Sequence, residues 1–546
     1  MPLEAPARIV DELTSRGYNV ERSAVTLLAG ADDPAHAIEA TVEAAPADAL
    51  VLTEDHVRAA LGGSTAEDES STDPTTATGS PEAETAPADD AMLPRENPSV
   101  STGDTPTNST DDGGGVPVET EGSSSGTEPA ETGVDATFER SVDPALRSVT
   151  VDGDMTGAST GTGRYEDFVS VFRDRYRKLS SQLRGRVNHR PASSIESMAP
   201  GSDVATVGMV DDIRSTASGH WLIDLEDTSG TFPWLVMKDK DVADAVEELL
   251  LDEVIAVEGT LSDDAGIAFV DAIHFPDVPR TYSPSTADRP VEAALISDVH
   301  VGSQEFMRDA WERFADWLHT PEAANVEYLL IAGDMVEGVG VYPDQDEELD
   351  VVDIYEQYER FSELLKLVPG DIEIRMVPGN HDAVRLAEPQ PAFDEELRSI
   401  MSAHDASIHS NPSTVTVEGV SILMYHGVSL DELIAELPEE KASYDQPHRA
   451  MYQLLKKRHV APKYGGHMRL APEEQDYLVI EDVPDVFHTG HVHKLGWGQY
   501  HNVLAVNSGC WQAQTAFQES VNIDPDAGYA PILDLQSLEL TVRKFS

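Results

Sequence analysis

Short apolar runs of strand length recur through the second half of the chain, and each ends in polar residues. They span residues 292–297, 328–332, 372–377, 421–425 and 486–487, and helical segments follow them. Alternating strands and helices predict an α/β domain, expected here over residues 286–546. Open α/β sheets place their functional sites at the carboxyl ends of the strands, which is where these polar residues stand.

A different pattern covers residues 201–285, where short apolar runs indicate five strands. The runs are residues 204–208, 221–225, 232–236, 254–259 and 267–270, with a helix expected at 242–251. This order favours an OB-type β-barrel, a fold that often binds single strands through basic and aromatic side chains. Trp221, Phe232 and Trp234 lie on the candidate face, where cations are few. Core packing is therefore the favoured role of these rings, and docking that of the barrel.

The N-terminal part is expected to hold a small helical module and a linker. In residues 1–61, Ile9, Val10 and Leu13 share one helical face and Gly17 is a plausible stop. Residues 62–160 are rich in small, polar and acidic side chains, and aromatic residues are absent from 62–137. Such a segment buries too little apolar surface to offset its ordering entropy, so we predict an acidic, disordered linker.

Residues 161–200 form the most basic stretch and are expected to be helical. Phe168, Val171 and Leu179 have helical spacing. The cations among them are Arg173, Arg175, Arg177, Lys178, Arg184, Arg186 and Arg190. Two interpretations stay open with equal weight: a solvated helix that covers an adjacent domain, or a helix that contacts the phosphates of DNA.

Charge and cysteine content narrow the class of protein. The 546 residues predict two to four domains, and 100 acidic against 37 basic residues give a net charge of −63. Carboxylates in such excess repel one another unless salt screens them, which favours the high-salt cytoplasm of a halophile. The single cysteine, Cys510, excludes internal disulfides and thiolate metal clusters. The N-terminus does not resemble a signal peptide, and apolar runs of membrane-spanning length are absent, so no membrane role is expected.

Five short motifs in the α/β region carry ligand-type side chains, in order and each after an apolar run. The candidate metal ligands are Asp298, His300, Asp334, Asn380, His426, His491 and His493. Nitrogen and oxygen ligands of this kind suit two divalent ions, which together perform phosphoester hydrolysis. Any one motif occurs by chance in a turn, but the ordered set favours a metallophosphoesterase.

His381 and Asp382 are the candidate catalytic residues that are not needed as ligands. His381 follows Asn380 and is placed to protonate a leaving oxygen or to stabilise charge on the phosphate. Asp382 could orient that imidazole or cap the next helix, and the first role is favoured. Other histidines of this region, including His459 and His488, are expected to be ordinary surface or core residues.

These motifs resemble the calcineurin-like metallophosphoesterase superfamily. More narrowly, residues 378–385, 388–391, 425–427 and 506–515 resemble the small subunit of the archaeal family D DNA polymerase. The resemblance covers residues 160–546 well and 1–60 loosely. It implies a multidomain α/β protein in which an OB-type barrel precedes a two-layered α/β/β/α phosphoesterase domain. Cys510 stands where we expect a small hydroxyl residue. This position lies outside the ligand set.

The resemblance also implies an activity, cofactors and partners. It implies a 3′-to-5′ exonuclease that degrades single-stranded DNA ends and so proofreads for a large subunit with the polymerase site. Single-stranded DNA and primer–template DNA would be the nucleic-acid partners. The complex would be a heterodimer or heterotetramer. One ion would take Asp298, His300, Asp334 and His493, and the other Asp334, Asn380, His426 and His491. Manganese is the favoured ion, with iron, zinc and magnesium as alternatives. His381 matches the family's catalytic histidine.

Two alternatives to this function stay open. One is a structural subunit with an idle site, and the other is a stand-alone phosphodiesterase for small molecules. The barrel, the linker and the basic stretch disfavour the second, because a nucleotide-sized substrate needs none of them. Trp511, Phe517, Tyr529 and Ile532 follow the last ligand, and we expect exposed apolar surface there that a partner would cover.

Overall fold

The computed structural model describes residues 140, 142–159, 163–342, 345–402, 407–466, 468–520 and 523–546, with separate positions between 19 and 58. It divides into two compact units, Met1–Pro87 and Ala88–Ser546. In the first unit, β1 (Asn19–Val20) pairs in parallel with β2 (Val51–Leu52), which the helical prediction for residues 1–61 did not include. The predicted linker from residue 62 to 139 lies outside the described residues.

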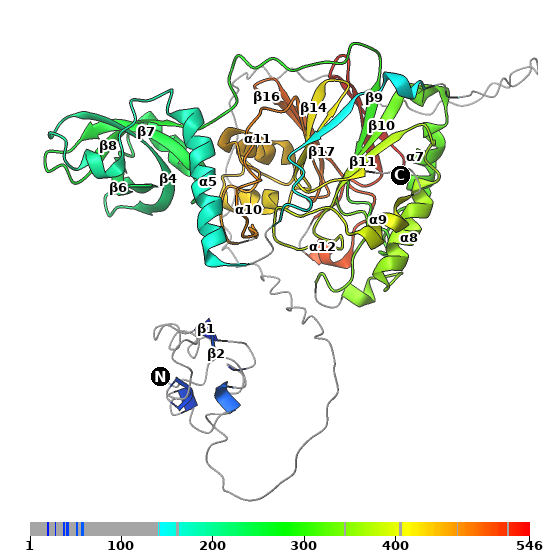
Figure 1. Cartoon of the computed structure of the whole chain (residues 1–546), viewed down its shortest axis with the longest axis horizontal. Coiled ribbons are helices and arrows are strands. Elements are labelled where there is room, and N and C mark those ends of the chain that lie inside the picture. Colours follow the sequence, from blue (N-terminus) through cyan, green and yellow to red (C-terminus); the bar gives the residue numbers. More distant parts are fainter. Residues whose placement is uncertain are drawn as a thin grey trace, which may run out of the picture. The chain divides into compact units, whose positions relative to one another are not determined.

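The barrel of the second unit closes in the order β4-β5-β6-β8-β7 (Figure 1). Its strands are β4 (Asp203–Ser215), β5 (Trp221–Asp227), β6 (Gly230–Val236), β7 (Val254–Leu261) and β8 (Ala268–His274). The helix expected at 242–251 is a 3-10 helix, η2 (Asp241–Glu248). Phe232 and Trp234 are buried and Trp221 packs against the same core, so the expected core role of these rings is confirmed.

Two six-stranded sheets form the centre of the larger described part of this unit. The first has the order β12 (Ser407–Ile408), β11 (Glu373–Val377), β10 (Val326–Ala332), β9 (Glu292–Ile296), β18 (Tyr529–Asp534) and β19 (Leu540–Lys544). The second has the order β16 (Leu495–Tyr500), β17 (Val503–Ser508), β15 (Val486–Thr489), β14 (Val420–Met424), β13 (Ser413–Val417) and β3 (Val149–Asp152). Apolar side chains of both sheets, such as Leu295, Leu330 and Ile422, share one core between them.

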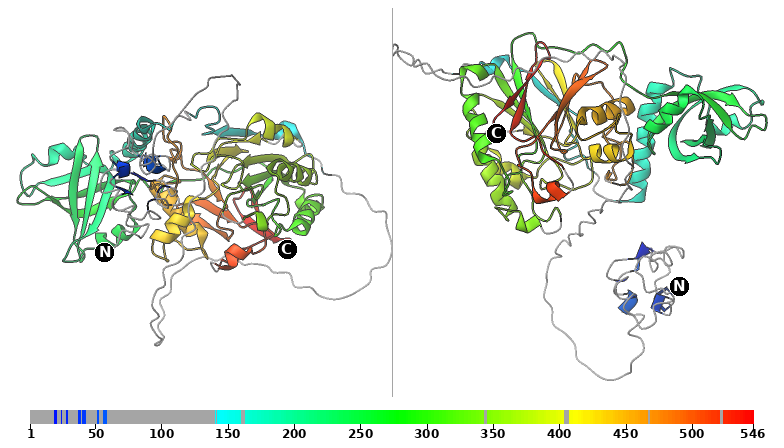
Figure 2. Two further views of the ribbon diagram at one scale, coloured as in Figure 1. Left: turned by 90° about the horizontal axis from the view of Figure 1, so that it is seen from below. Right: turned by 180° about the vertical axis from the view of Figure 1, so that it is seen from behind.

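Helices cover the outer faces of this sandwich (Figures 1 and 2). The first sheet packs against α7 (Arg308–Leu318), α8 (Ile354–Leu365) and α9 (Glu395–Ile400). The second packs against α10 (Ser429–Glu436) and α11 (Pro447–Lys457). Shorter helices are η1 (Pro144–Leu146), η3 (Pro321–Ala323), η4 (Gln345–Glu347), α6 (Ala192–Ile195) and α12 (Ala516–Ser520). The described part of the chain holds no helix long and apolar enough to cross a bilayer.

The last part of the predicted linker belongs to the sandwich, so the boundary at residue 160 is wrong. β3 pairs antiparallel with β13, from Val149 opposite Val417 to Asp152 opposite Thr414. Upstream, the guanidinium of Arg140 donates to the carbonyl oxygens of Leu318 and Ala323 at 2.9 and 2.6 Å. A four-residue edge strand in a polar context gives too short a periodic signal to be recognised in sequence.

Candidate metal centre

The predicted ligands come together at the carboxyl ends of strands from both sheets. From the first sheet, Asp298 and His300 follow β9, Asp334 follows β10 and Asn380 follows β11. From the second sheet, His426 follows β14, and His491 and His493 follow β15. The site therefore lies where the two sheets meet, and it needs both to be in place.

One group of ligand atoms consists of Asp298, His300 and His493, all buried. The Nε2 atoms of His300 and His493 lie 3.0 Å apart, and Oδ1 of Asp298 is 3.5 Å from Nε2 of His493. Ligand atoms bound at about 2.1 Å to one ion stand about 3.0 Å from each other in octahedral geometry and about 3.4 Å in tetrahedral geometry. These spacings fit a divalent cation.

A second group consists of Asp334, His426 and His491. Oδ2 of Asp334 lies 3.1 Å from Nε2 of His426, which is 3.0 Å from Oδ1 of Asn380. The same Asp334 oxygen is 3.8 Å from Nε2 of His300 in the first group. The Asp334 carboxylate thus stands between the two groups, as a bridging ligand must.

Hydrogen bonds from the far side of the rings fix which nitrogen of each histidine faces the site. Nδ1 of His426 donates to the carbonyl oxygen of Ala332 at 2.9 Å, which leaves the Nε2 lone pair for a metal. Nε2 of His491 lies 3.0 Å from Oδ2 of Asp431, so Nδ1 is its nitrogen available for binding. Sequence reasoning missed Asp431, because it stands in α10, 60 residues before its partner.

Glu337 is a further site residue that the sequence analysis missed. Its Oε2 lies 2.9 Å from Nδ1 of His300, and Gln512 donates to the same oxygen at 2.8 Å. The pKa of Glu337 falls to about 2, because the charges of His300 and His381 outweigh the effect of burial. A carboxylate behind a ligating histidine is the usual support of a metal site. The sequence offered one indication that Glu337 belongs to the site, its position three residues after Asp334 in the same loop.

The charges of the cluster are arranged as expected for a site that binds cations. Burial alone would raise the pKa of Asp334, but His426 and His381 lower it below its usual range. Burial likewise opposes a charge on His300, yet Glu337 and Asp298 raise its pKa well above the usual value. Carboxylates buried this deeply require positive charge nearby, and divalent ions are suited to supply it.

Five of the seven candidate ligands have a left-handed backbone. Asp298, His300, Asp334, His491 and His493 have φ between 51 and 71°. This conformation costs side-chain-bearing residues about 1–2 kcal/mol each, and such strain gathers at functional sites. The backbone thus turns sharply after each strand and directs the ligand side chain into the space between the sheets.

The glycine of the Gly-Asn-His motif is required by close packing. A Cβ at Gly379 would meet Oδ1 of Asp334 and would lie 2.6 Å from the backbone nitrogen of Asp334. The glycine therefore lets the loop after β11 run directly against the bridging carboxylate.

His381 lies beside the first group, and Asp382 does not orient it. Nδ1 of His381 donates to the carbonyl oxygen of Glu337 at 2.8 Å, and its ring centroid is 4.9 Å from that of His300. Asp382 instead accepts the backbone N–H of Gly379 at 2.9 Å and the hydroxyl of Tyr358 at 3.0 Å. The expected orienting role of Asp382 is therefore wrong. Its carboxylate holds the motif loop in shape.

The basic helix α5 (Tyr165–Leu183) packs against both the barrel and the sandwich. Arg175 is fully buried, and its Nε pairs with Oδ2 of Asp476 at 2.8 Å, so it is not accessible to DNA. Lys178 pairs with Asp174 and Glu481 at 3.1 and 2.9 Å. These contacts favour the first interpretation of the basic stretch, a helix that covers an adjacent domain.

The other cations of this stretch are exposed, but several are engaged. Arg177 pairs with Asp174, and the guanidinium of Arg184 lies over the ring of Tyr176. Arg186 donates to the carbonyl oxygens of Phe275 and Pro276 at 2.9 and 2.6 Å. Arg173 is exposed in the middle of the helix.

The exposed apolar surface expected after the last ligand is only partly present. Trp511 and Ile532 are buried in the core of the first sheet, so the expectation is wrong for them. Tyr529 is half-buried, with Lys544 over its ring. Phe517 alone of the four is exposed, at 52%.

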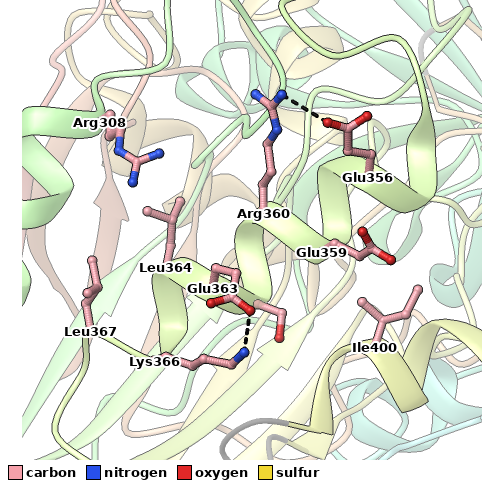
Figure 3. A pocket seen from close by; sticks show the side chains of 10 residues that line it. Arg308, Glu356, Glu359, Arg360, Glu363, Leu364, Lys366, Leu367 and Ile400 are labelled. Carbon is pink, nitrogen blue, oxygen red and sulfur yellow. Dashed lines mark hydrogen bonds and ion pairs between the residues drawn. The ribbon is translucent and has the colours of Figure 1, made fainter.

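A hollow of about 830 Å³ lies along α8, away from the ligands (Figure 3). Its charged side chains neutralise one another, since Arg360 pairs with Glu356 at 3.0 Å and Lys366 pairs with Glu363 (Figure 3). It contains no predicted site residue.

Comparison with known proteins identifies the family. Residues 293–494 match the family model that describes the B-type subunits of DNA polymerases alpha and epsilon. The chain is 65% identical over the whole of both chains to a DNA polymerase II small subunit of Halobacterium salinarum. It is 44% identical to that of Archaeoglobus fulgidus, over 69% of this chain and 76% of the relative. A solved archaeal phosphodiesterase is 14% identical over 46% of this chain and 99% of its own, but with a TM-score of 0.24 the likeness is slight.

The fold defines a mixed α/β protein built on two sheets and a small closed barrel, with buried His and Asp groups that could hold a metal ion. The full-length identity is decisive: the chain belongs to the family of archaeal DNA polymerase II small subunits, the small subunits of family D DNA polymerases. The resemblance found in the motifs is thereby confirmed.

Proposed function

We propose that this chain carries a two-metal 3′-to-5′ exonuclease that degrades single-stranded DNA ends for a replicative DNA polymerase. The observation that carries the proposal is the position of Asp334 between two buried ligand groups, at 3.1 Å from His426 and 3.8 Å from His300. An idle site would have no need to keep two buried carboxylates among four histidines, because unpaired buried charge is costly.

The residues fit two divalent ions, with manganese favoured. Asp298, His300 and His493 would hold one and Asn380, His426 and His491 the other, with Asp334 shared. Such ions, when bound, acidify a water and neutralise the phosphate oxygens. His381 has its Nδ1 proton held by the carbonyl of Glu337, so Nε2 is the nitrogen that can give a proton to the leaving oxygen.

We further propose that the barrel, over residues 201–285, is an OB fold and that the sandwich, over 286–546, is a calcineurin-like phosphoesterase domain. The helix η2 between the third and fourth strands supports the first assignment, and the order of the ligand motifs supports the second. We also propose that residues 1–61 form a separate module and that residues 161–200 form a basic helical segment. Residues 142–159 move from the linker to the sandwich, because β3 pairs with β13.

The proposed partner is the large polymerase subunit, in a heterodimer or heterotetramer that takes single-stranded and primer–template DNA. The relatives are named as small subunits, and a small subunit implies a larger one. Co-purification from the native host tests this. A chain that elutes alone, with no large polymerase chain attached, would contradict the partner and leave a free-standing nuclease.

The test of the activity is digestion of single-stranded DNA labelled at either end, in molar KCl with Mn²⁺, with and without the large subunit. We expect nucleotides to be released from the 3′ end by the native chain and none by Asp334→Ala, purified identically. Equal activity of the two would refute the ligand assignment. An inert native chain would indicate a structural subunit with an idle site. A small chromogenic diester hydrolysed faster than DNA would indicate a small-molecule phosphodiesterase.

A further inference from the structure

Two stacked aromatic rings, the inner of which lies next to His381, have no part in the mechanism above. Tyr342 lies in the loop after β10, and Phe517 lies in α12. Their ring centroids are 6.3 Å apart with an interplanar angle of 27°, so the rings are stacked. The ring of Tyr342 is also 6.2 Å from that of His381. Phe517 is the outer ring of this pair and is 52% exposed.

The inner ring is held in place by the metal-site loop. The hydroxyl of Tyr342 lies 3.2 Å from Oε1 of Glu337 and 3.0 Å from Oε2 of Glu348. The same loop runs against the backbone of His381, since a Cβ at Gly338 would collide with the carbonyl oxygen of His381. Tyr342 is therefore fixed relative to the candidate catalytic histidine.

The outer ring is tied to a metal ligand through its own short helix. Gln518, the next residue after Phe517, lies 2.8 Å from Nδ1 of His493 through its side-chain amide. The backbone N–H of Thr515 donates to the same side chain at 3.2 Å, and the backbone N–H of Gln518 donates to the Thr515 hydroxyl at 3.2 Å. The helix thus sets the position of Phe517 against the first ligand group.

A rigid, exposed aromatic face next to a phosphate site is what a nucleobase requires. Proteins that bind single strands stack successive bases on such rings, whatever the base. Stacking is uncharged, so salt that screens phosphate contacts leaves it in force, which suits a chain with a net charge of −63. We propose that Phe517, supported by Tyr342, is the stacking platform for the nucleobase next to the phosphate being cleaved. This inference rests on the proposed nuclease function.

The first experiment compares substrates with and without the base. Single-stranded DNA ending in a normal nucleotide and DNA ending in an abasic nucleotide are given to the native chain, Phe517→Ala and Phe517→Trp. We expect Phe517→Ala to lose roughly tenfold in kcat/KM on the normal end and less than about twofold on the abasic end, and Phe517→Trp to recover most of the loss. The matched control is Tyr355→Ala, which removes another exposed ring, 44% accessible, from α8.

The second experiment measures stacking without turnover. A 2-aminopurine at the 3′ end is bound to His381→Ala and to His381→Ala with Phe517→Ala. Stacking quenches its fluorescence, so we expect quenching by the first protein, retained in molar KCl, and little by the second.

The outcomes separate this inference from the proposed function. Equal losses on normal and abasic ends, or no loss from Phe517→Ala, would overturn the platform. Failure to associate with the large polymerase chain, with unchanged hydrolysis, would assign Phe517 to the protein interface instead. If the native chain releases no nucleotide, the proposed activity fails, while 2-aminopurine quenching that depends on Phe517 would still support the platform.

Discussion

At the scale of single residues, the candidate ligands are distinguished by a strained backbone conformation. Five candidate ligands have φ between 51 and 71°, a conformation that the surrounding strands and loops must enforce. This backbone strain lowers the stability of the fold. The two sheets offset it through the continuous core that they share below the site. The fold itself thus holds the candidate ligands in place, and a preformed arrangement would avoid an ordering cost on binding an ion.

His381→Ala tests the separation of catalysis from metal binding. His381 is held by the carbonyl of Glu337 and belongs to neither of the two ligand groups that Asp334 joins. We expect turnover to fall by about 10²–10⁴-fold, the usual worth of general acid–base help, with metal content unchanged. Metal analysis of the purified variant is the control. Loss of an ion would make His381 a ligand, through the group it forms with His300 and Glu337.

Gly379→Ala tests the close packing at the bridge. The added methyl would overlap Asp334, whose backbone nitrogen is 2.6 Å from the Cβ position. We expect a loss of about 1–3 kcal/mol in the free energy of unfolding, as for overpacking, and loss of metal-dependent activity. Gly370→Ala is the matched control, because its Cβ position has no atom within 4 Å. Similar melting temperatures and activities of the two variants would refute this account.

The sequence predicts the ligands themselves but not their supports. Motif order and strand ends suffice to bring Asp298, Asp334 and His493 together. The partners Glu337, Asp431 and Gln518 make contacts that depend on how loops meet in space, and no local pattern encodes them. Asp382 illustrates the same limit: proximity to His381 in sequence suggested an orienting role, whereas its carboxylate turns toward Gly379 and Tyr358.

At the scale of elements, the strands that carry the ligands were predictable because they are apolar throughout. Buried parallel strands such as β10 and β15 lack alternation, yet their length and flanking motifs distinguish them from helices. β3, which was missed, has only four residues, and the helix expected at 242–251 is present as a 3-10 helix, η2. Their form is decided by the neighbours that they pack against.

The contact between α5 and the sandwich rests on a buried ion pair that is open to test. Nε of Arg175 and Nε2 of His459 both approach Oδ2 of Asp476, at 2.8 and 2.9 Å. His459 is neutral, because burial lowers its pKa to about 4 and its Nδ1 accepts the N–H of Ala461. Arg175 is therefore the positive partner of Asp476.

Arg175→Ala should leave the buried Asp476 carboxylate without its cation. We expect the free energy of unfolding to fall by about 3–5 kcal/mol, as for other broken buried pairs. Arg173→Ala, an exposed cation of the same helix, is the matched control and should leave stability unchanged within about 0.5 kcal/mol. Chemical denaturation in molar salt measures both. Weaker DNA binding by Arg173→Ala alone would revive the phosphate-contact interpretation for the exposed part of the helix.

At the scale of the whole molecule, the excess of acidic residues affects both the stability of the fold and the proposed binding of DNA. With 100 acidic and 37 basic residues, even complete one-to-one pairing leaves 63 carboxylates unpaired, the net charge of the chain. Cations that the sequence offered for DNA, such as Arg175 and Lys178, are occupied by acidic partners. Long-range electrostatic attraction therefore contributes little to any binding of the DNA phosphate backbone by this protein.

Salt should therefore stabilise the fold while it weakens phosphate contacts. Raising KCl from 0.1 M to 1 M shortens the screening length from about 10 to 3 Å, which suppresses repulsion among exposed carboxylates. We expect the melting temperature to rise across this range. Sucrose stabilises by exclusion but does not screen charge, so at matched water activity it should raise the melting temperature by less than KCl does. An unchanged melting temperature in KCl would contradict the argument. Each phosphate contact loses affinity with rising salt, so under the proposed function we expect DNA capture in molar salt to depend on the candidate metal ligands, the partner chain and the exposed ring of Phe517.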